Sequence, residues 1–152
     1  MKIGFIIMNY GQGGVERMVV NTATSLTHLG AECFMVVARS NGPYLDELGG
    51  MVNVHVLSSE GELVELLGSI APDILVSAKI EDDKRIAETV PLLNEKPKVF
   101  FRVGNPIAHR IALRRGSWIS RRRSLRRLRD LYRQADGFIA VSKGIANDLV
   151  KG

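Results

Sequence analysis

The first thirty residues constrain the fold more than any other part of the chain. Lys2–Met8 is a short apolar run, and Asn9–Gly14 is rich in glycine. Val15–Leu29 then repeats apolar residues at helical spacing and ends at Gly30. Glycines let a backbone approach a ligand closely, and the first N–H groups of a helix have no intrahelical acceptor. A strand, a glycine turn and a helix in this order are typical of an anion site in an α/β protein.

The rest of the chain alternates between strand and helix patterns. Apolar, β-branched runs predict six strands, at Lys2–Met8, Glu32–Ala38, Val52–Leu57, Asp73–Ser77, Lys98–Arg102 and Gly137–Val141. Helical patterns lie between them, at Val15–Leu29, Glu60–Ile70, Asp82–Asn94, Ser117–Gln134 and Lys143–Val150. Such alternation indicates right-handed βαβ units, so we expect an α/β domain with a Rossmann-like, doubly wound parallel sheet of about six strands.

Ligands of doubly wound sheets bind beyond the carboxyl ends of the strands. The candidate site therefore consists of the segments that follow the predicted strands: Asn9–Gly14, Arg39–Gly42, Ser77–Glu81, Arg102–His109 and Ser142.

Length and composition narrow the class of protein. The 152 residues suit one globular domain, with 45% apolar and 24% charged residues. The apolar runs are shorter than the roughly 20 residues that a membrane-spanning helix needs. The single cysteine, Cys33, lies in an apolar run, which favours a buried, reduced thiol in a cytoplasmic protein. The three scattered histidines lack the spacing of a zinc site, so we expect no metal.

The positive charge is concentrated in one segment. Residues 102–133 contain eleven arginines, no lysine and one acid, a balance of +10. The remainder has ten basic and fifteen acidic side chains, a balance of −5, which gives the total of +5. The chain is thus a mildly acidic domain with one strongly basic segment.

The glycine turn does not match the common nucleotide-binding fingerprints. Glu16 stands at the third glycine position of the dinucleotide motif, and no Gly-Lys-Ser/Thr follows as in a P-loop. Arg39 after the second strand leaves an NADP-dependent reductase open. No lysine stands four residues after Tyr44 or Tyr132, however, so the tyrosine–lysine pair of short-chain reductases is missing. A tight turn without any ligand is another interpretation.

Several motifs in order resemble one enzyme family. Gly13–Arg17 reads Gly-Gly-Val-Glu-Arg, Leu26–Gly30 reads Leu-x-x-x-Gly, and 132–142 contains Ala-Asp-x-hydrophobic-hydrophobic-x-Val-Ser. Looser matches are Pro72–Ser77 and Arg102–Pro106. Together they cover nearly the whole chain, which resembles the N-terminal half of retaining glycosyltransferases of family 4 (group 1), enzymes of GT-B fold.

The resemblance implies a division of labour between two domains. Residues 1–152 would be the N-terminal, acceptor-side domain, and the C-terminal nucleotide-sugar domain is absent from this chain, so the fragment is expected to be inactive by itself. The donor would be a UDP- or GDP-sugar held mainly by the missing domain, with no tightly bound cofactor. Gly13, Gly14 and Glu16 would form the loop that faces the donor diphosphate. The resemblance assigns no catalytic residue.

The acceptor contacts implied by the resemblance are Arg102, Asn105 and His109. Many relatives carry a histidine where this chain has Gly104, so His109 is a candidate substitute for it. The acceptor would be a cell-surface or lipid-linked glycan, as in lipopolysaccharide or polysaccharide biosynthesis.

The arginine segment admits three interpretations: a solvated face, a contact with anionic lipid, or a contact with nucleic acid. A lipid-linked acceptor favours the second, with the protein peripheral on the inner face of the membrane. The expected basic strip is Arg114, Arg115, Arg121, Arg122, Arg123, Arg126 and Arg127. The alternative to a transferase is a non-enzymatic basic α/β module that binds nucleic acid or anionic membrane through this helix.

Overall fold

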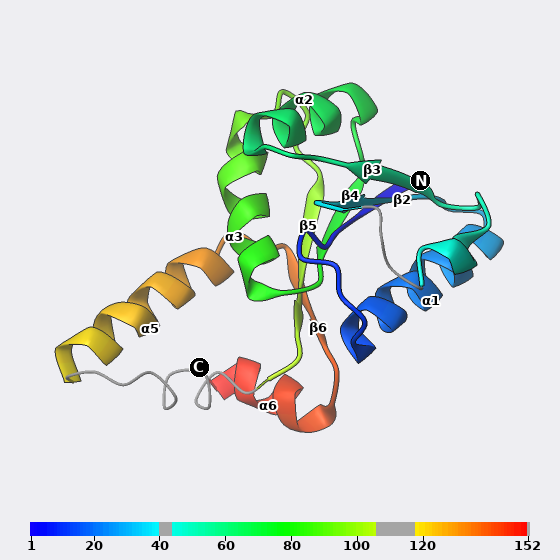
Figure 1. Ribbon diagram of the computed structural model, residues 1–152. Helices are drawn as coiled ribbons and strands as arrows, with labels where there is room; N and C mark the ends of the chain where they lie inside the picture. The colour runs from blue at the N-terminus through cyan, green and yellow to red at the C-terminus, as the bar shows by residue number, and fades with distance from the viewer. Residues whose placement is uncertain (40–43, 106–117, 152) are drawn as a thin grey trace.

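The computed structural model describes residues 1–39, 44–105 and 118–151. They form an α/β fold with a six-stranded sheet in the order β3-β2-β1-β4-β5-β6, and every neighbouring pair is parallel (Figure 1). The strands are β1 Lys2–Ile6, β2 Glu32–Val37, β3 Asn53–Val56, β4 Ile74–Ser77, β5 Lys98–Val103 and β6 Gly137–Ala140. The predicted Rossmann-like parallel sheet is confirmed.

Helices connect the strands on both sides of the sheet. The α-helices are α1 Gly14–His28, α2 Glu60–Ile70, α3 Ile80–Thr89, α5 Trp118–Tyr132 and α6 Lys143–Lys151. Two short 3₁₀ helices, η1 Asp46–Leu48 and η2 Val90–Leu92, complete the described elements. None of the described helices is both long and apolar enough to cross a membrane.

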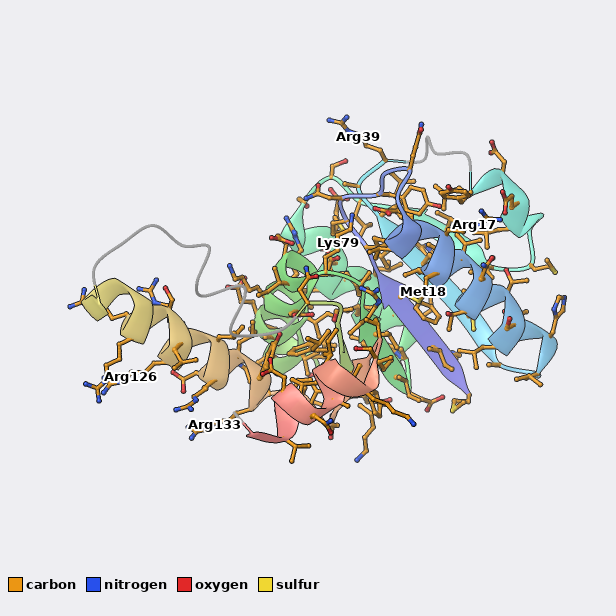
Figure 2. The ribbon with its side chains drawn as sticks, turned by 90° about the horizontal axis from the view of Figure 1, so that it is seen from below. Arg17, Met18, Arg39, Lys79, Arg126 and Arg133 are labelled. Carbon is orange, nitrogen blue, oxygen red and sulfur yellow. The ribbon has the colours of Figure 1, made fainter. Side chains whose placement is uncertain are left out.

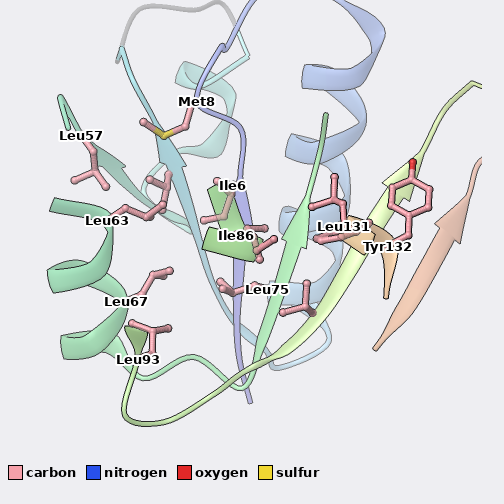
Figure 3. Close-up of a cluster of buried hydrophobic side chains, with 14 of the residues drawn as sticks. Ile6, Met8, Leu57, Leu63, Leu67, Leu75, Ile86, Leu93, Leu131 and Tyr132 are labelled. Atoms are coloured by element: carbon pink, nitrogen blue, oxygen red, sulfur yellow. The ribbon is translucent and has the colours of Figure 1, made fainter. Parts of the chain in front are cut away.

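One face of the sheet carries the larger core. Leu63 and Leu67 of α2 and Ile86 of α3 pack against Ile6 and Leu75 of the central strands (Figure 3). The C-terminal end of α5 and the helix α6 extend the same core over β5 and β6. Among the described side chains of α5, those near its C-terminal end pack on the sheet.

The opposite face is covered mainly by α1. Val19, Val20 and Ala23 of this helix are buried against β1 and β2, together with Cys33. Cys33 is a free, buried thiol, as the apolar run around it predicted. Because α1 covers only this half of the sheet, Ile139 at the far edge remains 44% exposed.

The third helix differs from its prediction. A single helix was expected over Asp82–Asn94, whereas α3 begins two residues earlier at Ile80 and gives way to η2 at Val90. Pro91 lacks an N–H, so it cannot donate the α-helical hydrogen bond to the carbonyl oxygen four residues earlier. The chain therefore tightens into a 3₁₀ turn, which ends at Leu92.

Two exposed glycines, one within a helix and one after a helix, should respond oppositely to alanine. Gly68 lies within α2 and an added Cβ would meet open space, so Gly68→Ala should stabilise the protein by up to about 1 kcal/mol. Gly30 follows α1 with a φ of +90°, so Gly30→Ala should cost about 1 kcal/mol despite equally open surroundings. Urea unfolding of both variants measures these changes; destabilisation by Gly68→Ala would contradict the helix assignment.

Candidate functional site

The order of the strands places the candidate site between β1 and β4. The chain runs from β1 outward to β2 and β3, and then returns to place β4 on the other side of β1. The loops after β1 and β4 thus leave the sheet toward opposite faces, since α1 and α3 belong to different cores. In open parallel sheets such a switch point is where ligands bind, beyond the carboxyl ends of the strands.

The glycine turn after β1 is organised around Glu16. This side chain lies in the first turn of α1 and is only 4% exposed. Its carboxylate accepts hydrogen bonds from the N–H of Gly11 at 3.2 Å and from the N–H of Gly13 at 3.1 Å. These two amides of the turn therefore point inward to Glu16 and are not free for a ligand.

Lys79 neutralises the buried carboxylate. Its Nζ lies 2.5 Å from Oε1 of Glu16 and also donates to the carbonyl oxygen of Asn9 at 2.6 Å. Burial acts to raise the pKa of Glu16, but the bond from Lys79, together with backbone N–H donors, outweighs it. The net pKa is below the usual 4.5, so Glu16 is a stable anion at neutral pH.

The glycines of the turn differ in how much space surrounds them. A Cβ on Gly13 would lie 2.9 Å from Oε2 of Glu16, and one on Gly11 would lie 3.4 Å from Oε1. A Cβ on Gly14 would meet nothing within 4 Å. Gly13 thus leaves room for Glu16, and Gly11 would tolerate a Cβ at ordinary contact distance. Exposed Gly14, at the start of α1, leaves room outside the protein. An external molecule can approach the backbone there.

A groove of about 480 Å³ starts at Gly14 and follows the flank of α1. It is lined by Gly14, Arg17, Met18, Asn21, Thr22, Ser25 and Leu26. Only its Gly14–Arg17 end is next to the strand ends, and there the start of the helix and a guanidinium favour an anion. The remainder runs along the helix, away from the site.

The first turn of α3 ties three strands together at the same edge. Asp82 accepts from the N–H of Met8, after β1, at 3.1 Å. Asp83 accepts from the hydroxyl of Ser77 at the end of β4, and that hydroxyl accepts from the N–H of Arg102 in β5 at 3.3 Å. Both residues are 1% exposed. These two buried aspartates therefore connect the ends of β1, β4 and β5.

Burial disfavours the negative charge of Asp82. Burial raises its pKa to about 6, and the bond from Met8 and the charges of Arg85 and Lys79 offset burial only in part. Its second oxygen, Oδ2, is buried without a hydrogen-bond partner among the described residues. Ionised Asp82 therefore costs stability at neutral pH.

The structure brings together only some of the residues predicted for the site. Gly13, Gly14 and Glu16 share the turn after β1, while Arg102 and Asn105 stand at the end of β5, with β4 between the two strands. The guanidinium of Arg102 lies over Gly104, where an added Cβ would be 2.9 Å from Nη1.

Part of the prediction lies outside the described residues. His109, Arg114 and Arg115 belong to 106–117, and Arg121 lies in α5 but its side chain is not described. Arg122, Arg123, Arg126 and Arg127 are exposed on α5. Within 1–39, 44–105 and 118–151 no three His, Cys, Asp or Glu side chains gather in a way that could hold a metal ion.

Sequence reasoning placed Ser77–Glu81 at the site but missed the roles of Lys79, Asp82 and Asp83. Acidic residues at the start of a helix normally signal interaction with the helix dipole in solvent. Their burial follows from the position of α3 on the sheet, which local sequence does not contain.

The fold defines a class of protein. The all-parallel sheet with helices on both faces is Rossmann-like and matches the domains of GT-B glycosyltransferases. HepE of Anabaena in complex with UDP-glucose has a TM-score of 0.70 at 17% identity, over 99% of this chain and 40% of that chain. The lipopolysaccharide outer core galactosyltransferase WaaB in its apo form has a TM-score of 0.67 at 15% identity, over 99% of this chain and 42% of its own.

An α-glucosyltransferase in complex with UDP and a 13-mer DNA is more distant, with a TM-score of 0.57 at 14% identity, over 92% of this chain and 37% of that chain. No protein-family model and no curated protein matches the chain. The chain spans about two fifths of the length of HepE and WaaB.

Removing the charge of Asp82 should change the pH dependence of stability. Because its pKa is about 6 in the folded protein and 3.8 ordinarily, the folded state binds the proton more tightly, and stability falls as pH rises from about 4 to 6. Asp82→Asn abolishes this loss, which is on the order of 2 kcal/mol. Urea unfolding at pH 4.0 and 7.5 should show the variant gaining on the wild type at the higher pH.

The control for this experiment is Asp46→Asn, which changes an exposed aspartate on η1. If Asp82→Asn and Asp46→Asn show the same pH dependence, burial of Asp82 does not govern it.

Proposed function

We propose that this chain is the N-terminal, acceptor-side domain of a glycosyltransferase that transfers a sugar from a UDP- or GDP-sugar, with retention of configuration as in family 4. The fold supports a glycosyltransferase domain of GT-B type. The observation that carries the proposal further is Gly14, an exposed glycine at a helix N-terminus, at the switch point of the sheet, with no internal contact that requires a glycine.

The proposed role of this corner is to meet the diphosphate of the donor. Departure of a nucleoside diphosphate from a sugar leaves negative charge on the leaving oxygens, which fixed N–H dipoles and cations stabilise. The first N–H groups of α1 and the guanidinium of Arg17 suit that task. Glu16 does not oppose it, because Lys79 and two loop amides already neutralise its carboxylate.

The acceptor is assigned to the carboxyl ends of the neighbouring strands. Arg102 and Asn105 are the proposed contacts, with His109 as a further candidate, and they stand on the β5 side of the site. A polar guanidinium and an amide are suited to hydroxyl groups of a glycan. WaaB acts in the lipopolysaccharide outer core, which makes a cell-surface or lipid-linked glycan the acceptor class that we propose.

A second domain completes the proposed enzyme. This chain corresponds to about two fifths of HepE, which was solved with UDP and glucose. We propose that a nucleotide-sugar domain is supplied outside the 152 residues, and that the fragment alone does not catalyse transfer.

We further propose that α5 binds anionic membrane. Figure 2 shows α5 extending beyond the sheet, with Arg126 and Arg133 directed away from it. Beside these arginines a groove of about 460 Å³ is lined by Leu125, Leu128, Arg129, Tyr132, Arg133, Phe138 and Leu149. Cationic side chains around an apolar groove suit a surface of phosphate head groups over acyl chains. Such binding would keep a cytoplasmic enzyme at the inner face of the membrane.

Blocking Gly14 should strongly reduce donor use without unfolding the protein. In a longer polypeptide that adds the sequence encoded directly after Gly152, Gly14→Val should lower kcat/KM for nucleotide release on the order of 100-fold, since a side chain would displace the diphosphate from the helix N–H groups. A panel of UDP- and GDP-sugars, with and without lipid-linked acceptors, identifies the donor.

Gly68→Ala is the matched control, because Gly68 also faces open space but lies on α2. Equal activity of Gly14→Val and Gly68→Ala would contradict the proposed contact. Absence of nucleotide release from every donor would instead favour a basic binding module, which a steep salt dependence of duplex DNA or RNA binding would reveal.

The membrane proposal predicts loss of binding when arginines of α5 are neutralised. Arg126→Gln combined with Arg127→Gln should weaken flotation with vesicles of phosphatidylglycerol and phosphatidylcholine by roughly thirtyfold, from about 1 kcal/mol per charge. The control is Lys84→Gln with Lys96→Gln, two exposed lysines distant from α5 in sequence. Equal weakening by both pairs would show that net charge alone, and not α5, binds the vesicle.

A further inference from the structure

The glycine turn is held by residues that lie outside the motif that contains it. Three groups between the end of β1 and the first turn of α1 are bound from the start of α3. Asp82 binds the N–H of Met8, and Lys79 binds the carbonyl oxygen of Asn9 and the carboxylate of Glu16. Lys79 is separated from Glu16 by 63 positions in sequence. The segment after β4 is thus bound to the segment after β1.

Lys79 supplies the positive charge in this contact. Its side chain is 28% exposed, whereas that of Glu16 is 5% exposed, so the pair is largely shielded from solvent. An ion pair with little access to water is screened less than a surface pair, and removal of one partner leaves the other as an uncompensated buried charge. The position of Glu16 therefore depends on Lys79.

The conformation of the turn depends in the same way on the position of Glu16. Its two oxygens divide between the amides of Gly11 and Gly13, and Lys79 binds Oε1, the oxygen that also receives Gly11. A shift of the carboxylate moves both amides, and with them the entry to α1 at Gly14. Figure 2 shows Lys79 and Arg17 in the same view of this end of the molecule.

We propose that Lys79 is a positioning residue: acting through Glu16, it sets the glycine turn in the conformation that leaves the start of α1 open to the donor diphosphate. The ligand in this statement rests on the proposed function, but the mechanical part concerns only the turn. Two acceptors of the protein, the carbonyl oxygen of Asn9 and the carboxylate of Glu16, hold the ammonium group of Lys79 at the turn.

The test is a double-substitution cycle read by amide hydrogen exchange in the 152-residue chain. Lys79→Met should speed exchange of the Gly11 and Gly13 amides at least tenfold relative to buried strand amides such as that of Val36. Glu16→Gln should do the same, and the double variant should add little to either single change, since both break one connection. Additive effects, or exchange at Gly11 and Gly13 within twofold of the wild type, would overturn the proposal.

Two further variants separate positioning from general stability. Lys79→Arg keeps the positive charge and should restore most of the slow exchange, while Lys84→Met, on an exposed lysine of the same helix, should leave it unchanged. If Lys79→Met does not fold, Lys79→Gln takes its place in the cycle, because its amide can still donate to Asn9. Failure of Lys79→Arg to restore slow exchange would also count against the proposal.

A carbon-13 titration of the Glu16 carboxyl group gives a direct signature. Lys79→Met should move its midpoint to higher pH, and Lys84→Met should not; an unmoved midpoint would refute the connection. A panel of UDP- and GDP-sugars, added to the longer polypeptide that continues after Gly152, then tests the ligand. Changes in exchange without any response of the Gly14 amide to a nucleotide sugar, in the wild type as well as the variants, support the role of Lys79 and overturn the proposed function instead.

Discussion

The buried carboxylate of Glu16 is the group on which the geometry at the carboxyl edge of the sheet depends. It needs donors because burial disfavours its charge, and it obtains them from Lys79 and from the amides of Gly11 and Gly13. These bonds select the shape of the turn after β1. They also explain the glycine at 13, where a Cβ would lie 2.9 Å from the carboxylate.

The same edge is assembled from segments far apart in the chain. Asp82 reaches Met8 across 74 positions, and Ser77 connects Asp83 to the backbone of Arg102 in the next strand. Placing charged groups here costs stability, as the raised pKa of Asp82 shows. A sheet with apolar cores on both faces supplies the burial that offsets this cost.

Local sequence patterns were sufficient to predict most of the fold but a smaller part of the site. Continuously apolar runs such as Glu32–Val37 identified the strands, because a strand covered on both faces must be apolar on both. The helix expected over Asp82–Asn94 was misplaced at both ends: its first turn contains acids that are buried, and Pro91 changes its last turn to 3₁₀. Glu16 was identified from its motif, whereas its partner Lys79 was not.

The sequence by itself determined the alternation of strands and helices, the glycine turn before α1 and the concentration of arginine in α5, since each depends on neighbours within a few positions. Only the tertiary structure decided that Lys79 pairs with Glu16 and that Asp82 is buried. It also decided that Gly14 borders open space whereas Gly13 borders the carboxylate of Glu16. The physical reason is that pairing β1 with β4 brings two distant loops into contact, and the burial and charge of those loops arise only from that contact.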